Sequence, residues 1–297
     1  MRISLFLILA ILMKISPVAG QTGQNDFPVL QGPYLGQKPP GSIPQTFAQG
    51  IVTTDYYNHC SISMSPDGSE IFWAMAPVDS TVRIYSSKIV NGVWTTPEIV
   101  SCTLKEGGDC PFISPDGKKM FFNSNRPITP QGSRRERVWW VERTSGGWGT
   151  PTPLGPEINA EHLHWQTSVD NKGNLYFGSE RSGSKGRDDV FMAEYVNGTY
   201  KKPVSLSAEI NSEEHEGCPF ISPDGGYIIF ARNGLRISYK QKDRSWTKSQ
   251  SLGNGFDGMC PYVSPDGKYL FYLTMGMKST DVNWASADSI EKLRPKQ

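Results

Sequence analysis

Hydrophobic and polar positions alternate along the chain in short runs, and these runs end at the same kind of turn. The strings Cys110–Gly117, Cys218–Gly225 and Cys260–Gly267 each combine an apolar run with Ser-Pro-Asp-Gly. Ser61–Gly68 is a fourth copy, and Gln166–Gly173 is a degenerate fifth copy that ends in Asp-Asn-Lys-Gly. Pro fixes the φ angle of the first turn position, Asp is accepted at the second, and Gly adopts the positive φ that closes the turn. Each string therefore predicts a tight β-hairpin.

Three more strands are predicted in each repeat. One apolar strand follows the turn directly, a loop leads to the next, and a second turn such as Asn91-Gly92 leads to the last. The last strand carries an aromatic residue and then Pro, as in Trp94 and Pro97, and blade four has Ser249 in place of Pro. Because Pro lacks an N–H, we expect this strand at the outer edge. Four strands at intervals of roughly 50 residues predict propeller blades.

The fifth repeat lacks its fourth strand, because the chain ends soon after Trp284. The spacing from Pro44 to Ile51 matches that from Pro151 to Ile158, so the N-terminal segment is expected to supply the missing strand and remove an open edge. The alternative, a two-sheet sandwich, does not predict five similar periods. We therefore predict an all-β chain, a single five-bladed β-propeller of four-stranded blades, closed by an N-terminal strand that completes the last blade.

The first residues have a different character. Arg2 precedes an apolar run from Ile3 to Met13, and small residues follow before Gln21. This pattern predicts a signal peptide over residues 1–20; the alternative, a membrane anchor, needs about 20 apolar residues. We expect residues 21–43 to wrap over the outside, residues 44–290 to form the propeller and residues 291–297 to be a tail. The mature protein is expected to be secreted or periplasmic, without a membrane span.

The Ser-Pro-Asp-Gly hairpins followed by aromatic strands resemble the WD40-like β-propeller repeat of the TolB family, which occurs in many secreted bacterial proteins. The resemblance covers about residues 44 to 290, and blade three departs from it at Val169–Gly173. It implies the fold and says little about function, because propellers support binding, scaffolding and catalysis.

The amino-acid composition limits which classes of binding partner are expected. A net charge of +1 makes nucleic acid and anionic membranes poor partners, and 11% aromatic residues argue against disorder. We expect a monomer. Five cysteines leave at least one unpaired. Cys110, Cys218 and Cys260 occupy equivalent positions at the start of their inner strands, and Cys60 is displaced from that position by one residue. These cysteines either bind a soft metal or pack in the interior. Cys102 and Cys110 bracket one loop and are candidates for a local disulfide, with the pairing left to their geometry.

The histidines and many of the charged residues are expected to lie on one face of the propeller. The loop that enters each inner strand and the loop that leaves its partner share a face, and all four histidines fall in entering loops. Trp165 either stacks on a sugar ring or packs. The alternative to a binding site on this face is a set of ordinary solvent-exposed loops without a ligand. The candidate ligand-binding residues are His59, Asp109, Arg126, His164, Trp165, Arg181, His215 and Asp257.

A metal site is the sharpest hypothesis on this face. Three imidazoles and an amide suit a divalent cation, Mn or Ca, with separate surface histidines as the alternative. The predicted ligands are His59, His164, Gln166 and His215. The set resembles the manganese site of oligogalacturonate lyase, another propeller. That resemblance implies β-elimination on a uronate, with the metal holding the carboxylate.

Two functions follow from the sequence. The first is an exported module that binds a glycan or a protein through the rim rich in histidine and acidic residues, without catalysis. The second is a carbohydrate-active enzyme, either a metal-dependent polysaccharide lyase or a glycosidase with two carboxylates. No catalytic residue is assigned, and a redox or soft-metal role is a further alternative.

Overall fold

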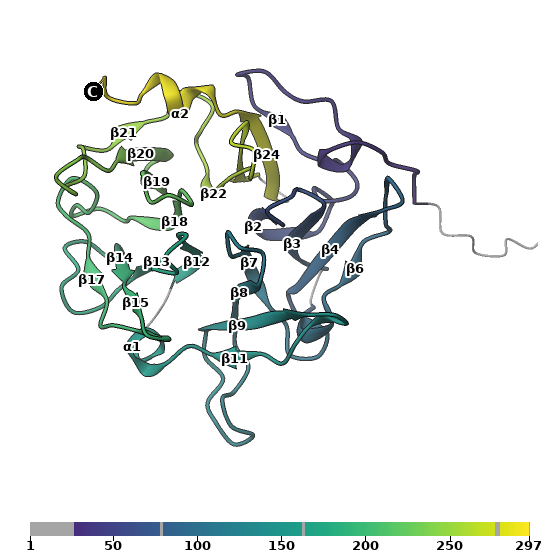
Figure 1. Ribbon diagram of the computed structural model, residues 1–297, viewed down its shortest axis with the longest axis horizontal. Helices are drawn as coiled ribbons and strands as arrows, with labels where there is room; N and C mark the ends of the chain where they lie inside the picture. Colours follow the sequence, from purple (N-terminus) through teal and green to yellow (C-terminus); the bar gives the residue numbers. More distant parts are fainter. Residues whose placement is uncertain (1–26, 78–79, 162–163, 277–279, 297) are drawn as a thin grey trace, which may run out of the picture.

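Five antiparallel sheets of four or five strands surround a common axis, like the blades of a fan (Figure 1). The structure, a computed structural model, describes residues 27–77, 80–161, 164–276 and 280–296. Each blade begins at the axis and ends at the outside, where the outer strand is split into two short pieces in blades one and two. The predicted five-bladed β-propeller is confirmed.

The strands follow the predicted order within every blade. Blade one contains β2 (Tyr57–Met64), β3 (Glu70–Ala76), β4 (Arg83–Val90), β5 (Val93–Trp94) and β6 (Glu98–Ile99). Blade two contains β7 (Asp109–Ile113), β8 (Lys119–Ser124), β9 (Arg137–Thr144), β10 (Gly147–Trp148) and β11 (Thr152–Pro153). Blade three contains β12 (His164–Val169), β13 (Leu175–Ser179), β14 (Asp189–Ala193) and β17 (Val204–Ser205), with the ribbon of β15 (Tyr195–Val196) and β16 (Thr199–Tyr200) between them.

Blade four contains β18 (Gly217–Ile221), β19 (Tyr227–Ala231), β20 (Leu235–Tyr239) and β21 (Gln250–Ser251). Blade five contains β22 (Met259–Val263), β23 (Tyr269–Met275), β24 (Thr280–Ser286) and β1 (Gln45–Thr46). The described helical turns are short: η1 (Tyr34–Gly36), η2 (Ser101–Thr103), α1 (Pro156–Asn159) and α2 (Asp288–Lys292). None of these described helices is long and apolar enough to cross a membrane.

The N-terminal strand closes the ring as predicted. β1 pairs with β24, where Gln45 lies opposite Trp284, and the Phe47 N–H donates to the carbonyl oxygen of Val282 at 2.7 Å. The Phe47 ring is fully buried and packs edge-on against Phe271 and Trp284, with ring centroids 5.1 Å from each. One strand from the start of the chain therefore completes the core of the last blade.

The segment before β1 also contacts blade one. The Trp94 N–H donates to the Leu30 carbonyl, and the Trp94 indole donates to the Gly32 carbonyl at 2.8 Å. Tyr34 is buried against blade five, and its hydroxyl donates to Asp266 at 2.9 Å. The described part of the segment thus joins the first and last blades. The predicted signal peptide, residues 1–20, lies outside the described residues.

The hairpin turns owe their shape to one serine and one aspartate. In the first copy the Ser65 hydroxyl donates to the Asp67 carboxylate, which also accepts the Ser69 N–H at 3.0 Å. The Ser65 hydroxyl is the main reason that the pKa of Asp67 lies below its usual value. In blade three Asp170 occupies the serine position and accepts the N–H groups of Lys172 and Asn174 itself. This explains why the degenerate copy still forms a hairpin.

Two turn glycines provide a matched test of backbone strain. Gly267 and Gly117 have φ values of 73° and 72°, but a Cβ at Gly267 meets open space while one at Gly117 lies 3.1 Å from Pro66. Gly267→Ala should lower the free energy of unfolding by about 1–2 kcal/mol through left-handed strain alone, and Gly117→Ala should lower it further. Urea denaturation measures both. Equal losses of unfolding free energy in the two variants would show that Pro66 moves away from the new Cβ without an energetic penalty.

The propeller axis is filled by aromatic side chains. Phe220 and Tyr262 lie with ring centroids 5.6 Å apart, and Phe112 lies 6.3 Å from each. The Tyr262 hydroxyl accepts the Met64 N–H at 3.0 Å, so these rings are tied to the backbone. These three rings pack together near the axis, and they also line a cavity of about 290 Å³ beside the hairpin turns.

Candidate functional site

Every inner strand has an irregularity where it enters the ring from the histidine-bearing face. The register with the second strand shifts between Asn58 and Ile62 in blade one and between Asp109 and Phe112 in blade two. The register also shifts at this place in the other three blades. A bulge of this kind places two residues opposite one and redirects a side chain. The bulges therefore determine which side chains face the mouth of the channel.

His59 and Asp109 form a pair across the junction of blades one and two. The His59 Nδ1 lies 2.9 Å from the Asp109 carboxylate, and 41% of the His59 side chain is exposed. The Asp109 carboxylate also accepts the N–H of Cys110 at 2.7 Å, which fixes its orientation. The sequence placed both residues on this rim, but it did not predict that they pair. With Nδ1 held by Asp109, the Nε2 of His59 has no partner among the described residues.

A polar cavity of about 540 Å³ opens beside this pair, and we call it the His59 pocket. Its lining combines carboxylates, amides and hydroxyls with one guanidinium. Glu106 is paired with Arg134 at 2.9 Å, and the Asn123 amide donates to Glu136 at 2.6 Å. The lining residues are His59, Ser80, Thr81, Val82, Glu106, Gly107, Gly108, Asp109, Asn123, Ser124, Asn125, Arg134 and Glu136.

The hydrogen bond to Asp109 raises the pKa of His59, while partial burial opposes this rise. A raised folded pKa means that the stabilising effect is complete below the ordinary histidine pKa near 6.5 and is lost as pH rises through the folded value. We expect Asp109→Asn to lower the melting temperature more at pH 5.5 than at pH 9. Thermal unfolding across this range measures the difference. A constant difference would contradict the charged pair.

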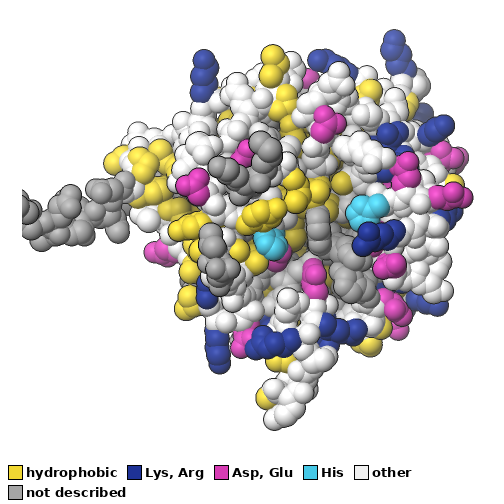
Figure 2. All heavy atoms as spheres, turned by 180° about the vertical axis from the view of Figure 1, so that it is seen from behind, with side chains coloured by type: hydrophobic (Ala, Val, Ile, Leu, Met, Phe, Trp, Pro, Cys, Tyr) yellow, Lys and Arg dark blue, Asp and Glu magenta, His cyan; other side chains and the backbone are white. Residues whose placement is uncertain are grey.

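A second pair of the same type occupies another part of the rim. The His215 Nδ1 is in close contact with the Asp188 carboxylate, and 56% of the His215 side chain is exposed. The Glu216 N–H donates to the Asp188 carbonyl at 2.8 Å, which holds the two loops together. In Figure 2 the histidine side chains form separate patches on this face. The rim therefore carries two distinct imidazole–carboxylate pairs.

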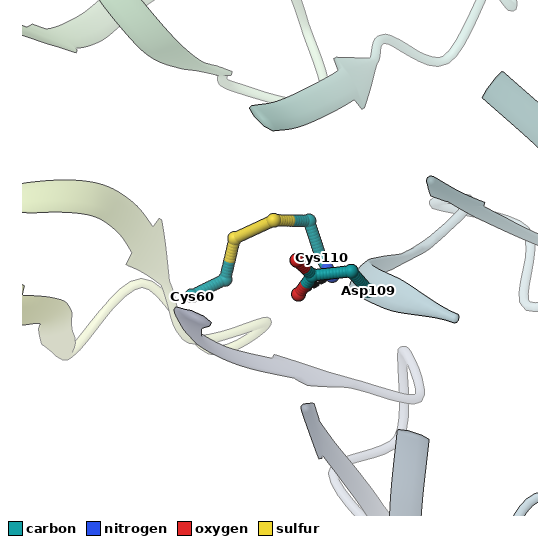
Figure 3. Close-up of side chains that lie close together, drawn as sticks. All are labelled: Cys60, Asp109 and Cys110. Atoms are coloured by element: carbon teal, nitrogen blue, oxygen red, sulfur yellow. Dashed lines mark hydrogen bonds between the residues drawn. A yellow bond between two sulfur atoms is a disulfide. The ribbon is translucent and has the colours of Figure 1, made fainter. Parts of the chain in front are cut away.

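A disulfide joins the inner strands of blades one and two. Cys60 and Cys110 are bonded, with Cα atoms 5.2 Å apart, and Asp109 lies beside the bridge (Figure 3). The candidate Cys102–Cys110 disulfide does not form, because Cys110 is bonded to the neighbouring blade and Cys102 is left as a thiol. Cys60, Cys110 and Asp109 are also the one group of three metal-ligating side chains found in the described ranges. A metal could bind there only after the bridge is reduced.

Solved TolB structures share this architecture. TolB from Acinetobacter baumannii matches with a TM-score of 0.51 at 18% identity, over 77% of this chain and 52% of that protein. A protein of Agrobacterium tumefaciens described as TolB matches with the same TM-score and identity, over 77% of each chain. The fold is a TolB-like β-propeller. The chain spans about half the length of the Acinetobacter protein. No protein-family model matches the sequence, and no curated protein does.

Two arginines of the predicted rim have their guanidinium groups engaged by the TolB-like propeller itself. Arg126 is buried and donates to the carbonyl oxygens of Cys102 and Gly107 at 3.0 and 2.7 Å. Arg181 donates to the Ile158 carbonyl at the end of α1 at 3.0 Å. These groups brace loops of the fold, so we leave both out of the proposed site. Asp257 is exposed in the loop before β22 and is not among the residues that line the His59 pocket.

The predicted metal ligands are only partly accounted for. The Gln166 side chain is buried, and its amide donates to the Pro261 carbonyl at 2.7 Å. His59 and His215 are each tied to a carboxylate of a neighbouring loop. The side chains of His164 and Trp165 lie outside the described residues. The site of His59, His164, Gln166 and His215, with Mn or Ca, therefore stays a prediction, as does sugar stacking by Trp165.

Proposed function

We propose that this TolB-like propeller is an exported binding module that recognises a neutral, hydroxyl-rich glycan in the His59 pocket. The observation that carries the proposal is the cavity of about 540 Å³ in which carboxylate, amide and hydroxyl side chains make up most of the lining residues. Binding pockets orient ligands through a small number of fixed polar groups, and the His59–Asp109 pair provides one.

The charges of the pocket favour a neutral ligand over an acidic one. Asp109, Glu106 and Glu136 line it, and its one guanidinium, from Arg134, is paired with Glu106. A sugar hydroxyl both donates and accepts, so it can bond carboxylates, amides and the open Nε2 of His59. The exposed Tyr57 ring lies 6.0 Å from His59 and offers an aromatic face next to the pocket.

The disulfide supports the proposed location. Disulfides persist in oxidising compartments such as the periplasm and the extracellular space and are rare in the cytosol. Cys60 and Cys110 are bonded in the folded ring. Together with the signal peptide predicted over residues 1–20, this favours a secreted or periplasmic protein.

A panel of neutral oligosaccharides, screened by calorimetry, tests the binding role. His59→Ala should weaken a bound glycan roughly tenfold, since a hydrogen bond to a charged group contributes about 1.5–3 kcal/mol. His215→Ala is the matched control, because it removes an imidazole that is paired with a carboxylate in the same way on another part of the rim. Equal losses in both variants, or no binding by the wild type, would contradict the proposal.

The His59–Asp109 pair also favours a second candidate, a carbohydrate-active enzyme. A carboxylate on Nδ1 orients the imidazole so that Nε2 can act as a base or hold a divalent cation. A general base must be neutral, so turnover should fall as pH decreases through the raised pKa of His59. Assays on uronate-containing polymers with and without Mn²⁺, beside elemental analysis of the purified protein, separate this role from simple binding.

A further inference from the structure

The five inner strands place one residue each at an equivalent position, seven residues before the turn glycine. We call this set the mouth ring, and it consists of Ser61, Cys110, Gln166, Cys218 and Cys260. Its members tie the blades together. The Ser61 hydroxyl donates to the Cys260 carbonyl at 2.5 Å, Gln166 donates across the axis to blade five, and Cys110 is bonded to Cys60 of blade one.

Cys218 and Cys260 are the remaining two members, and they face each other. Their sulfur atoms lie 3.3 Å apart between the adjacent blades four and five. Only 3% of Cys218 and 0% of Cys260 is exposed. This separation places the two sulfur atoms in contact, at a distance longer than a disulfide bond of about 2.05 Å.

The backbone of this pair matches that of the bonded cysteine. Cys110, Cys218 and Cys260 have φ values of 47°, 50° and 52°, in the left-handed region that residues other than glycine rarely adopt. All three lie at the bulge that opens an inner strand. The bulges therefore give the three cysteines the same backbone conformation; Cys110 bonds to Cys60, one residue out of register, whereas Cys218 contacts its equivalent Cys260.

We propose that Cys218 and Cys260 are an oxidisable site that forms a second inter-blade disulfide, with a low-molecular-weight disulfide such as glutathione disulfide as the oxidant. Cys218, the more exposed thiol, attacks one sulfur of the oxidant and releases one thiol. Cys260 then attacks the Cys218 sulfur of the mixed disulfide and releases the second thiol. The two protein thiols are oxidised, the oxidant is reduced to two thiols, and both hydrogens leave with them.

Burial and the neighbouring Cys218 raise the pKa of Cys260 well above the ordinary thiol value. Because the thiolate is the attacking species, the second step is slow near neutral pH and accelerates as pH increases. The bridge then joins blades four and five as the Cys60–Cys110 bridge joins blades one and two.

Counting thiols tests the proposal. The native wild-type protein is incubated with glutathione disulfide, quenched in acid, denatured without reductant, labelled with N-ethylmaleimide and weighed intact. Three thiols are free with the first bridge alone: Cys102, Cys218 and Cys260. We expect only Cys102 to be labelled after oxidation, with the loss of two hydrogens and a Cys218–Cys260 peptide on mapping.

Cys218→Ser is the control, and its Cys260 should stay available for labelling. Cys102→Ser should change the label count without changing the closure rate. Closure of the wild type should be several-fold faster at pH 9 than at pH 7. Retention of all three labels, or glutathione adducts that never resolve to the bridge, would overturn the proposal.

Discussion

Phe47→Ala is expected to lower the free energy of unfolding by about 3–5 kcal/mol, one of the largest losses available in the chain. The ring of Phe47 is fully buried and packs against Phe271 and Trp284 of the last blade. Its removal leaves a cavity where the first and last parts of the chain meet, and it weakens the strand that closes the propeller. Urea denaturation followed by tryptophan fluorescence measures the loss.

The same strand provides the control for this experiment. Gln45 and Thr46 pair with β24 through their backbones, but their side chains are exposed. Thr46→Ala should therefore change the free energy of unfolding by no more than about 0.5 kcal/mol. If Phe47→Ala were equally mild, the closing strand would not be part of the cooperative core.

The fold could be predicted from sequence because its signals are local and repeated. Ser-Pro-Asp-Gly fixes a hairpin through contacts within a few residues, as the bond between Ser65 and Asp67 shows. The closing strand could be predicted from spacing alone, because Phe47 follows the pattern of every other outer strand. The hairpins and the closing strand could both be predicted because they depend on the spacing of residues within short segments, which can be read from the sequence.

For the candidate site, the sequence predicted the face of the propeller that carries it but not which side chains pair there. Strand direction placed His59 and Asp109 on one rim, but their pairing depends on two bulges in different blades. The same limit applies to Cys110. An ideal register gave no reason to pair it with Cys60, and proximity in sequence favoured Cys102. A one-residue offset between the Cys60 and Cys110 positions was the available signal.

Ser249 shows how a departure from the repeat can carry information. It replaces the proline of the other outer strands, and its hydroxyl accepts hydrogen bonds from Arg232 and Arg236 at 2.8 and 3.3 Å. A proline offers no hydroxyl at that place. The substitution therefore belongs to a buried polar network of blade four, which spacing alone does not reveal.

Arg232→Met should cost about 3–5 kcal/mol of unfolding free energy, because the buried Glu216 carboxylate loses its cationic partner and keeps its hydrogen bonds from Ser212. The Arg232 guanidinium lies 3.1 Å from Glu216, whose side chain is 0% exposed, and also donates to the Ile210 carbonyl. A buried ion pair adds little net stability over an apolar pair, but the loss of one member is costly. Denaturant unfolding of the single variants measures the cost.

The double variant Glu216→Gln/Arg232→Met identifies the cause. We expect it to recover much of the stability lost in Arg232→Met, because no uncompensated charge remains. The exposed pair of Arg134 and Glu106 is the matched comparison, and Arg134→Met should cost less than about 1 kcal/mol. Losses in the double variant equal to the sum of the two single variants would show that the residues act independently. Recovery would show that this arginine maintains the rim through charge compensation, which places its role in the scaffold that holds the loop of His215.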